Sequence, residues 1–393
     1  MATELAPVTP SVMKWARETI GVSLEEAARR AGVKPERVQE WESGKKEPTV
    51  AKLRTLAKFY QRPLSVFFLP EPPPDFSTIR DFRRNPGQDD LLWSLSLHKV
   101  YRRALEQQEI TEDILDDDGE HALVRVPSAA ISDGAETVAD VARQALGVSL
   151  REQFSWRRPE EAFAGWLQAV EDLGVFVLRT SDVSVDEMRG LSISSGAVPV
   201  IVINALDWPR GQVFTLAHEL VHLILRQGGL CDLLEPSAGS ARRVETFCNA
   251  AASAMLMPED AFLDSSVVGP PGEREWEDEV LVQLGARFGV SQEAVLRRLV
   301  TLKRASMDFY LQKRQEYLEI YHEQREEEKE RRRQRDSQGG PPPHRMAIRD
   351  RGKPYVRLVL DAYHRDVIGP STLSSFLGLK LRHIPALEHE VRG

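Results

Sequence analysis

A His-Glu-x-x-His sequence is the clearest chemical motif of the chain. His218 and His222 are four residues apart, with Glu219 between them. On a helix, two histidines at this spacing share one face, so both imidazoles can bind one metal ion while the glutamate acts as a general base. The flanking residues are apolar, which predicts a buried helix. Two buried histidines and a glutamate are costly unless they are paired or bind a metal, so we favour a metal site over two surface histidines.

A catalytic zinc usually has three protein ligands and one open position, so the third ligand must come from another part of the chain. Residues 242–258 read as a second buried helix, with Glu245 near its start and Asn249 one turn later. We predict that Glu245 is the third ligand; the alternative is a carboxylate that only complements the helix dipole. Cys231 and Cys248 are rival ligands, although reduced cysteines are more often small buried apolar residues.

Residues 23–44 have the pattern of a helix-turn-helix. Ser23 can cap the first helix, Gly32 supplies the turn, and Pro35 suits the first turn of a second helix that ends near Glu42. This second helix would enter the major groove of DNA. Residues 11–70 contain twelve lysines and arginines but seven acids, so the segment is basic although the whole chain has a formal charge of −8.

Together with residues 44–49, this segment resembles the Xre/Cro-like repressor DNA-binding domain, which implies five helices over about residues 8–70. The resemblance implies DNA contacts of two kinds, because cations bind phosphates while forked donors and acceptors read base edges. Arg37 and Gln39 would contact bases, and Lys34, Lys45 and Lys46 would contact phosphates. The alternative is a helical module that docks on protein and does not bind DNA.

The composition restricts the class of protein. With 393 residues, the chain is long enough for two to four domains. It is 41% hydrophobic and 28% charged, with a mean hydropathy of −0.36, which excludes wholesale disorder. No apolar run could span a membrane and the first residues lack a signal-peptide pattern, so we expect a cytoplasmic protein without a membrane partner. Two cysteines are too few for a disulfide framework, and we expect both to be reduced.

Apolar periodicity and turn residues predict the remaining elements. Helices are predicted over 89–112, 135–146, 159–173, 214–225, 242–256, 276–288 and 291–305, and strands over 175–178 and 199–204. The last two helices are joined by a tight bend at Gly289. The charges of residues 310–335 alternate in sign, which is typical of a solvated helix and less often of a coiled-coil contact. Residues 336–343 read as a flexible linker.

Four separated blocks resemble the ImmA/IrrE family of metallopeptidases over about residues 135–310. They are Gly190–Ile193, Pro199–Asn204, Phe214–His222, and Glu245–Ala252 followed by Leu256–Pro258. The resemblance implies a zincin-like fold, in which an edge strand of a small sheet lies beside the active-site helix. It also implies Zn²⁺, with Mn²⁺ as a substitute, held by His218, His222 and Glu245.

The same resemblance implies hydrolysis of an Xre-type repressor in a stress, DNA-damage or mobile-element response. Glu219 would take a proton from a metal-activated water and pass it to the leaving amine. The strand over 199–204 could pair with an extended substrate by β-augmentation. The sequence leaves the oxyanion stabiliser open, and its candidates are Arg189, Arg242, Arg243 and Tyr310.

The sequence therefore predicts a mainly α protein with a small β-sheet (α+β). The predicted parts are an Xre-like helix-turn-helix domain (8–70), a linker with a helix (71–134), a zincin-like metallopeptidase domain (135–310), a charged helix with a flexible linker (311–343) and a small C-terminal helical unit (344–393). Two other functions stay open. One is a transcriptional regulator that senses a metal or ligand without catalysis. The other is the peptidase of a toxin–antitoxin or phage-immunity pair, with the antitoxin as its substrate. Homodimerisation also stays open.

Overall fold

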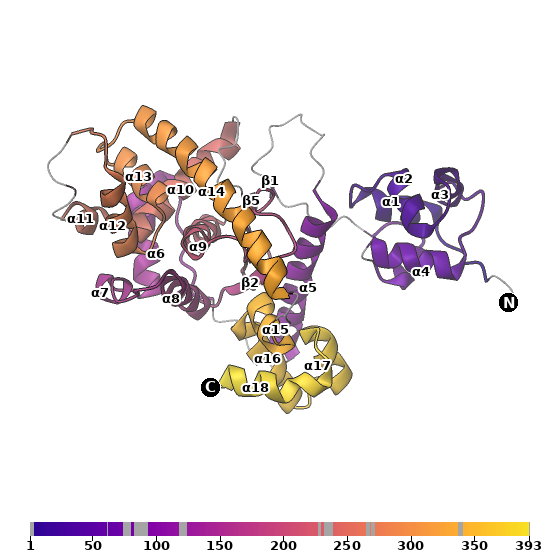
Figure 1. Ribbon diagram of the computed structural model, residues 1–393. Helices are drawn as coiled ribbons and strands as arrows, with labels where there is room; N and C mark the ends of the chain where they lie inside the picture. The colour runs from indigo at the N-terminus through magenta and orange to yellow at the C-terminus, as the bar shows by residue number, and fades with distance from the viewer. Residues whose placement is uncertain are drawn as a thin grey trace. The chain divides into compact units, whose positions relative to one another are not determined.

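The computed structural model describes residues 4–60, 62–73, 80–81, 93–117, 124–226, 229–231, 239–264, 268, 272–336 and 341–392. The chain forms two compact units, one of Met1–Thr78 with Pro86–Arg103 and one of Ile79–Asn85 with Ala104–Gly393. Helices dominate both units and one small sheet lies in the second, so the predicted mainly α class with a small sheet is confirmed (Figure 1). No helix in the described part of the chain is both long and apolar enough to cross a membrane.

The first unit is the helix-turn-helix domain. It contains α1 (Pro10–Glu18), α2 (Leu24–Ala31), α3 (Pro35–Glu42), α4 (Val50–Phe59) and the 3-10 helix η1 (Leu64–Phe68). The Ser23 hydroxyl accepts a hydrogen bond from the Glu26 amide at 3.2 Å, and Gly32 ends α2 with a φ of 64°. The predicted second helix has the bounds of α3. The fifth helix that the resemblance implied is a short 3-10 turn.

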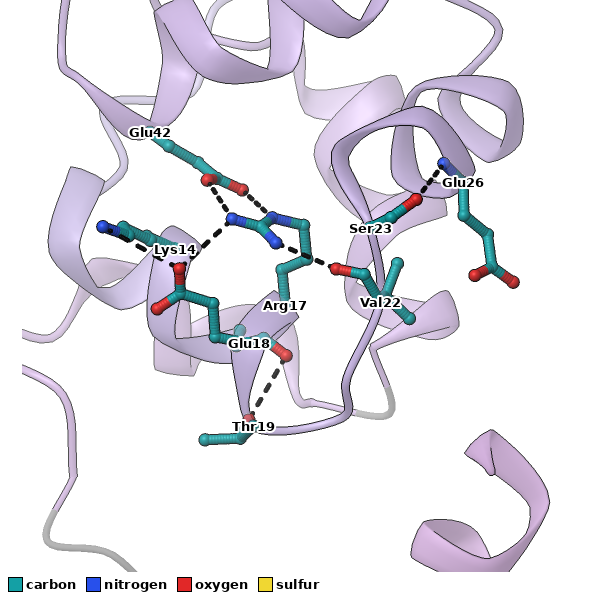
Figure 2. Close-up of polar contacts among 9 residues, drawn as sticks. Lys14, Arg17, Glu18, Thr19, Val22, Ser23, Glu26 and Glu42 are labelled. Atoms are coloured by element: carbon teal, nitrogen blue, oxygen red, sulfur yellow. Dashed lines mark hydrogen bonds and ion pairs between the residues drawn. The ribbon is translucent and has the colours of Figure 1, made fainter. Parts of the chain in front are cut away.

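A buried ion pair fixes α3 against α1. Arg17 of α1 donates from Nε and Nη2 to the two carboxylate oxygens of Glu42, at 2.7 and 2.8 Å, and from Nη1 to the carbonyl of Val22 at 2.8 Å (Figure 2). The two charged side chains are only 11% and 6% exposed. Val38, one turn before Glu42, and Trp41 are buried in the apolar core. A bidentate contact of this kind is geometrically demanding, so it holds α3 in one orientation.

The second unit is built mostly from helices. These are the main part of α5 (Leu95–Asp117), then α6 (Ala135–Leu146), α7 (Leu150–Gln153), α8 (Pro159–Asp172), α9 (Pro209–Ile224), α10 (Gly239–Leu256), α11 (Glu259–Leu263), α12 (Asp278–Phe288), α13 (Gln292–Thr301), α14 (Met307–Asp336), α15 (Pro343–Arg351), α16 (Lys353–His364), α17 (Pro370–Leu377) and α18 (Ile384–Arg392), with 3-10 turns η2 (Ile131–Asp133) and η3 (Leu381–His383). The helix predicted over 89–112 is α5, which starts later and runs further. Residues 337–340 of the predicted linker lie outside the described residues.

The sheet has the strand order β1-β5-β3-β4-β2. Its strands are β1 (Arg80–Asp81), β2 (Phe176–Thr180), β3 (Gly190–Ile193), β4 (Val200–Asn204) and β5 (Gly229–Cys231). β2 runs parallel to β4, and β3 runs antiparallel to both β4 and β5. β3 was not predicted as a strand. The run is only four residues long, and all four are buried, although small or polar residues (Gly190, Ser192) alternate with apolar ones (Leu191, Ile193). The burial of β3 therefore does not follow the alternation that marks a half-exposed strand.

The expectation that residues 199–204 form an edge strand for substrate is wrong. β4 pairs with β2 over all five of its residues on one side and with β3 on the other. The backbone donors and acceptors of β4 are therefore used within the sheet, and an extended peptide cannot add to it.

The helix with the His-Glu-x-x-His motif is buried on all sides. Every residue of α9 from Gln212 to Ile224 is buried. α9 packs against α8 and α10 and covers β3 and β4, while α10 packs against α6. The apolar residues that flank the motif predicted this burial, and the packing places α10 directly beside the motif.

The bend between α12 and α13 was predicted, and Gly289 makes it with a φ of 74°. In the second helix of this pair, Val295, Leu296 and Leu299 are fully buried in the core of the unit. The C-terminal helices α15–α18 cluster together in Figure 1 and share a core around Tyr355 and Val359. α15 packs on β2, so this cluster abuts the sheet.

Candidate metal centre

Two helices bring three metal-binding side chains together. Nε2 of His218 lies 3.1 Å from one carboxylate oxygen of Glu245, and Nε2 of His222 lies 3.1 Å from the other. The two Nε2 atoms are also 3.1 Å apart. In the part of the chain that is described, these residues form a group of potential ligands whose atoms all lie within 4.8 Å. α9 supplies both histidines at one face, and α10 supplies the carboxylate.

The group fits a divalent metal such as Zn²⁺. Nitrogen and oxygen ligands at zinc distances in a tetrahedral site are about 3.3 Å apart, close to the separations found here. All three side chains are essentially fully buried. Burial raises the pKa of Glu245, but the charge and hydrogen bonds of His218 and His222 outweigh it and hold the pKa of the carboxyl well below its usual range. An ionised carboxylate beside two imidazoles is the donor set that a catalytic zinc uses.

The alternatives to Glu245 as third ligand are weaker in the structure. α10 begins at Gly239, so Glu245 lies beyond the first helical turn, where the helix dipole acts most strongly. Cys248 is buried and free, and burial raises the pKa of its thiol, so it stays protonated and is a poor ligand. The side chain of Cys231 lies outside the described atoms; its backbone, in β5, pairs with Gly190.

The close approach of β3 to α9 depends on a glycine. A Cβ atom at Gly190 would lie 2.8 Å from Oε1 of Glu219 and 2.5 Å from Cγ2 of Thr215. Glu219 is fully buried, so this strand backbone forms one wall around its carboxylate. The sequence analysis did not predict this role, because it named Gly190 only as part of a block shared with a family. A glycine in a short, mostly apolar run is the signal that could have indicated a close approach of the backbone.

The four candidate oxyanion stabilisers lie in different surroundings. Arg189 forms an ion pair with Asp207 at 3.2 Å. The Tyr310 hydroxyl accepts a hydrogen bond from Arg297 at 2.9 Å. Arg242 and Arg243 lie on the exposed side of α10. These positions leave the oxyanion stabiliser unassigned.

The predicted DNA-contacting side chains are all exposed on the first unit. They are Lys34, Arg37, Gln39, Lys45 and Lys46. Glu40 also lies on this surface, where its carboxylate is 3.1 Å from Arg37 and 3.0 Å from Lys46. The acid therefore offsets part of the positive charge that DNA phosphates would meet.

Comparisons with known proteins match both parts of the chain. Residues 170–300 match the IrrE N-terminal-like domain of peptidase family M78, and residues 13–67 match a helix-turn-helix family. The radiation response metalloprotease IrrE of Deinococcus radiodurans is 37% identical over 105 residues, which cover 25% of this chain and 30% of that protein. The same-named protein of Deinococcus deserti is 36% identical over 105 residues, with 25% and 35% covered. The chain thus matches about a third of each relative's length.

One solved structure, a Mycobacterium tuberculosis transcriptional regulator, is 19% identical in sequence. The match covers 51% of this chain and 53% of the chain of that regulator. Its TM-score of 0.31 is too low to support an argument about the fold. The sequence matches and the buried His-His-Glu group agree with each other. The chain therefore joins an N-terminal segment that matches a helix-turn-helix family, over residues 13–67, to a segment that matches the IrrE-like M78 metallopeptidase family, over residues 170–300.

Proposed function

We propose that the protein is a DNA-binding regulatory metallopeptidase of the His-Glu-x-x-His type that hydrolyses a peptide bond in a partner protein. The observation that carries the proposal is the buried group of His218, His222 and Glu245, next to the buried carboxylate of Glu219. A metal sensor needs the three ligands but has no need of a fourth ionisable group at this position. We propose Zn²⁺ as the metal, with Mn²⁺ as a substitute.

The proposed mechanism divides the work among these side chains. When bound, the metal would polarise the substrate carbonyl and make water more acidic at neutral pH. His218, His222 and Glu245 would hold it. Glu219 would accept a proton from the attacking water and deliver it to the nitrogen of the leaving amine. Glu219 is fully buried, and its packing against β3 limits the positions that its carboxylate can take.

We propose an Xre-type repressor as the substrate, in a stress or DNA-damage response. Two observations support this: the chain carries its own helix-turn-helix domain, and its curated relatives are named as radiation response metalloproteases. A DNA-bound peptidase would meet repressors bound to the same region. In the proposed DNA complex, Arg37 and Gln39 read base edges while Lys34, Lys45 and Lys46 bind phosphates. We also propose that the protein acts in the cytoplasm.

Glu219→Gln tests the peptidase directly. The variant keeps the size of the side chain but cannot accept a proton, so cleavage should slow by about 10²- to 10⁴-fold while metal content and melting temperature stay unchanged. The substrates are the repressor-like proteins encoded beside the gene, incubated with and without a chelator. Glu259→Gln, an exposed glutamate at the start of α11, is the matched control and should cleave normally.

Three outcomes decide between the functions. Cleavage that survives in metal-loaded Glu219→Gln would refute the mechanism. Derepression of target genes without cleavage of any protein would favour a metal-sensing regulator. Cleavage confined to an antitoxin encoded beside the gene would favour a peptidase of a toxin–antitoxin pair over a peptidase of a stress response.

A further inference from the structure

A small basic pocket lies between α9, α13, α14 and the start of β3. It has a volume of about 80 Å³. Its lining comprises Arg189, Gly211, Phe214, Ser291, Glu293, Ala294, Arg297, Arg314 and Leu318. Pockets for whole small molecules usually measure about 300–1,000 Å³, so this one suits a single side chain or a group of that size.

Positive charge exceeds negative charge in the lining. The lining holds three arginines and one carboxylate, that of Glu293. Arg189 also pairs with the buried Asp207 at 3.2 Å, so one positive charge remains in excess. Arg297 donates from Nε and Nη2 to the hydroxyl of Tyr310, at 3.2 and 2.9 Å, which is a neutral partner. Arg314 reaches Glu293 through Nε alone, at 3.5 Å. Enclosed cations are costly without matching anions, so the pocket is electrostatically suited to one more anionic group.

The chemistry of the walls favours a carboxylate on an apolar stem. A guanidinium is a planar fork of donors that matches the two oxygens of a carboxylate. The arginines are largely covered, with side-chain exposures of 22% for Arg189 and 20% for Arg314. Phe214, Leu318 and Ala294 supply an apolar wall. A glutamate or aspartate side chain has both parts, methylene carbon and carboxylate.

The pocket lies along the metal-bearing face of α9. Gly211 is seven residues before His218, which brings the two to nearly the same face, about 10 Å apart along the helix axis at 1.5 Å per residue. Arg189 directly precedes Gly190, which abuts Glu219. An extended peptide covers about 3.3 Å per residue, so a chain held at the metal centre would reach the pocket about three residues from the bond that is cut.

We propose that this pocket binds an acidic side chain of the cleaved polypeptide, about three residues from the scissile bond. This inference rests on the proposed peptidase function. It assigns Arg189, Arg297 and Arg314 to substrate selection. The protein would then recognise the sequence around the scissile bond of its substrate as well as the fold of that substrate.

The test uses the metal-loaded full chain and a library of synthetic peptides with mixed sequences, with the cut sites read by mass spectrometry. Wild type should show about tenfold enrichment of Asp and Glu at one position near the cut, the size expected for a charge-assisted contact. Arg297→Gln and Arg314→Gln should each reduce the enrichment, and Arg314→Glu should shift the preference towards Lys and Arg. Arg331→Gln, on the exposed part of α14, is the matched control and should keep the wild-type profile.

A second readout separates this proposal from the peptidase itself. Peptides retained by metal-loaded Glu219→Gln are identified without cleavage, and they should show the same enrichment, lost when Arg297→Gln is added. Enrichment among retained peptides with no cleavage by wild type would refute the peptidase and leave the carboxylate pocket standing. If the acid preference is missing from both readouts, or survives both arginine variants in folded protein, the pocket assignment is wrong.

The pocket could instead bind a free small carboxylate, and glutarate is the probe for this alternative. Competition by glutarate that depends on Arg297, combined with no acid preference among peptides, would show that the pocket takes a free small carboxylate. Glutarate that competes only with the acidic peptides would support a substrate side chain. Melting temperatures of each arginine variant establish that it is folded before its profile is compared.

Discussion

Replacing Gly190 by alanine should separate metal binding from catalysis. The new Cβ would lie 2.8 Å from Oε1 of Glu219, and ordinary contact begins at 3.4 Å, so the carboxylate must move by about 0.6 Å. A misplacement of about 1 Å at a reacting group can cost about 100-fold in rate, so we expect a loss of about 10- to 100-fold. None of the three metal ligands is among the nearest atoms of the new methyl group, so metal content should stay at the wild-type level.

The assay measures cleavage rate, bound metal and melting temperature for each variant. Gly190→Ala should also lose about 1–3 kcal/mol of stability, because the methyl overlaps Cγ2 of Thr215 as well. Adding Thr215→Ser removes that methyl group, so the double variant should regain stability while its cleavage stays slow.

Gly165→Ala is the matched control, since its Cβ would collide with Trp156 on a different part of the unit. It should lower the melting temperature without a comparable loss of rate in the folded enzyme. A Gly190→Ala protein that cleaves at the wild-type rate would refute the argument that this strand positions Glu219. A double variant that regains both stability and rate would place the whole effect on Thr215.

Three further predictions concern the metal, DNA and pH. Glu245→Ala should lose most of its bound metal, measured by elemental analysis; unchanged metal would contradict Glu245 as third ligand. Glu40→Gln should raise DNA affinity and steepen its salt dependence by about one unit of slope, whereas the exposed control Glu36→Gln should change both less, in binding titrations at several salt concentrations. Burial raises the pKa of Glu171 from 4.5 to about 8, so the folded chain keeps a proton that the unfolded chain releases, and stability should fall as pH rises across this window. Glu171→Gln should flatten that fall in melts from pH 5 to 8, and an unchanged pH profile would refute the assignment.

Local signals in the sequence determined the helices and the motif. Ser23, Gly32 and Pro35 marked the turn of the helix-turn-helix, because caps and left-handed turns depend on neighbouring residues. The shared face of His218 and His222 also follows from the helical period alone. These features need no knowledge of the rest of the chain, and for the same reason the bounds of α3 were predicted correctly.

Tertiary packing decided the rest. The sequence did not reveal that β4 lies inside the sheet, because strand order depends on which segments pair across long stretches of chain. It named Glu245 as a candidate, but only the packing of α10 against α9 placed its oxygens 3.1 Å from both histidines. The basic pocket joins Arg189 with Arg297 and Arg314, more than a hundred residues later. Such contacts form only when buried helix faces meet, and no local pattern encodes their distance.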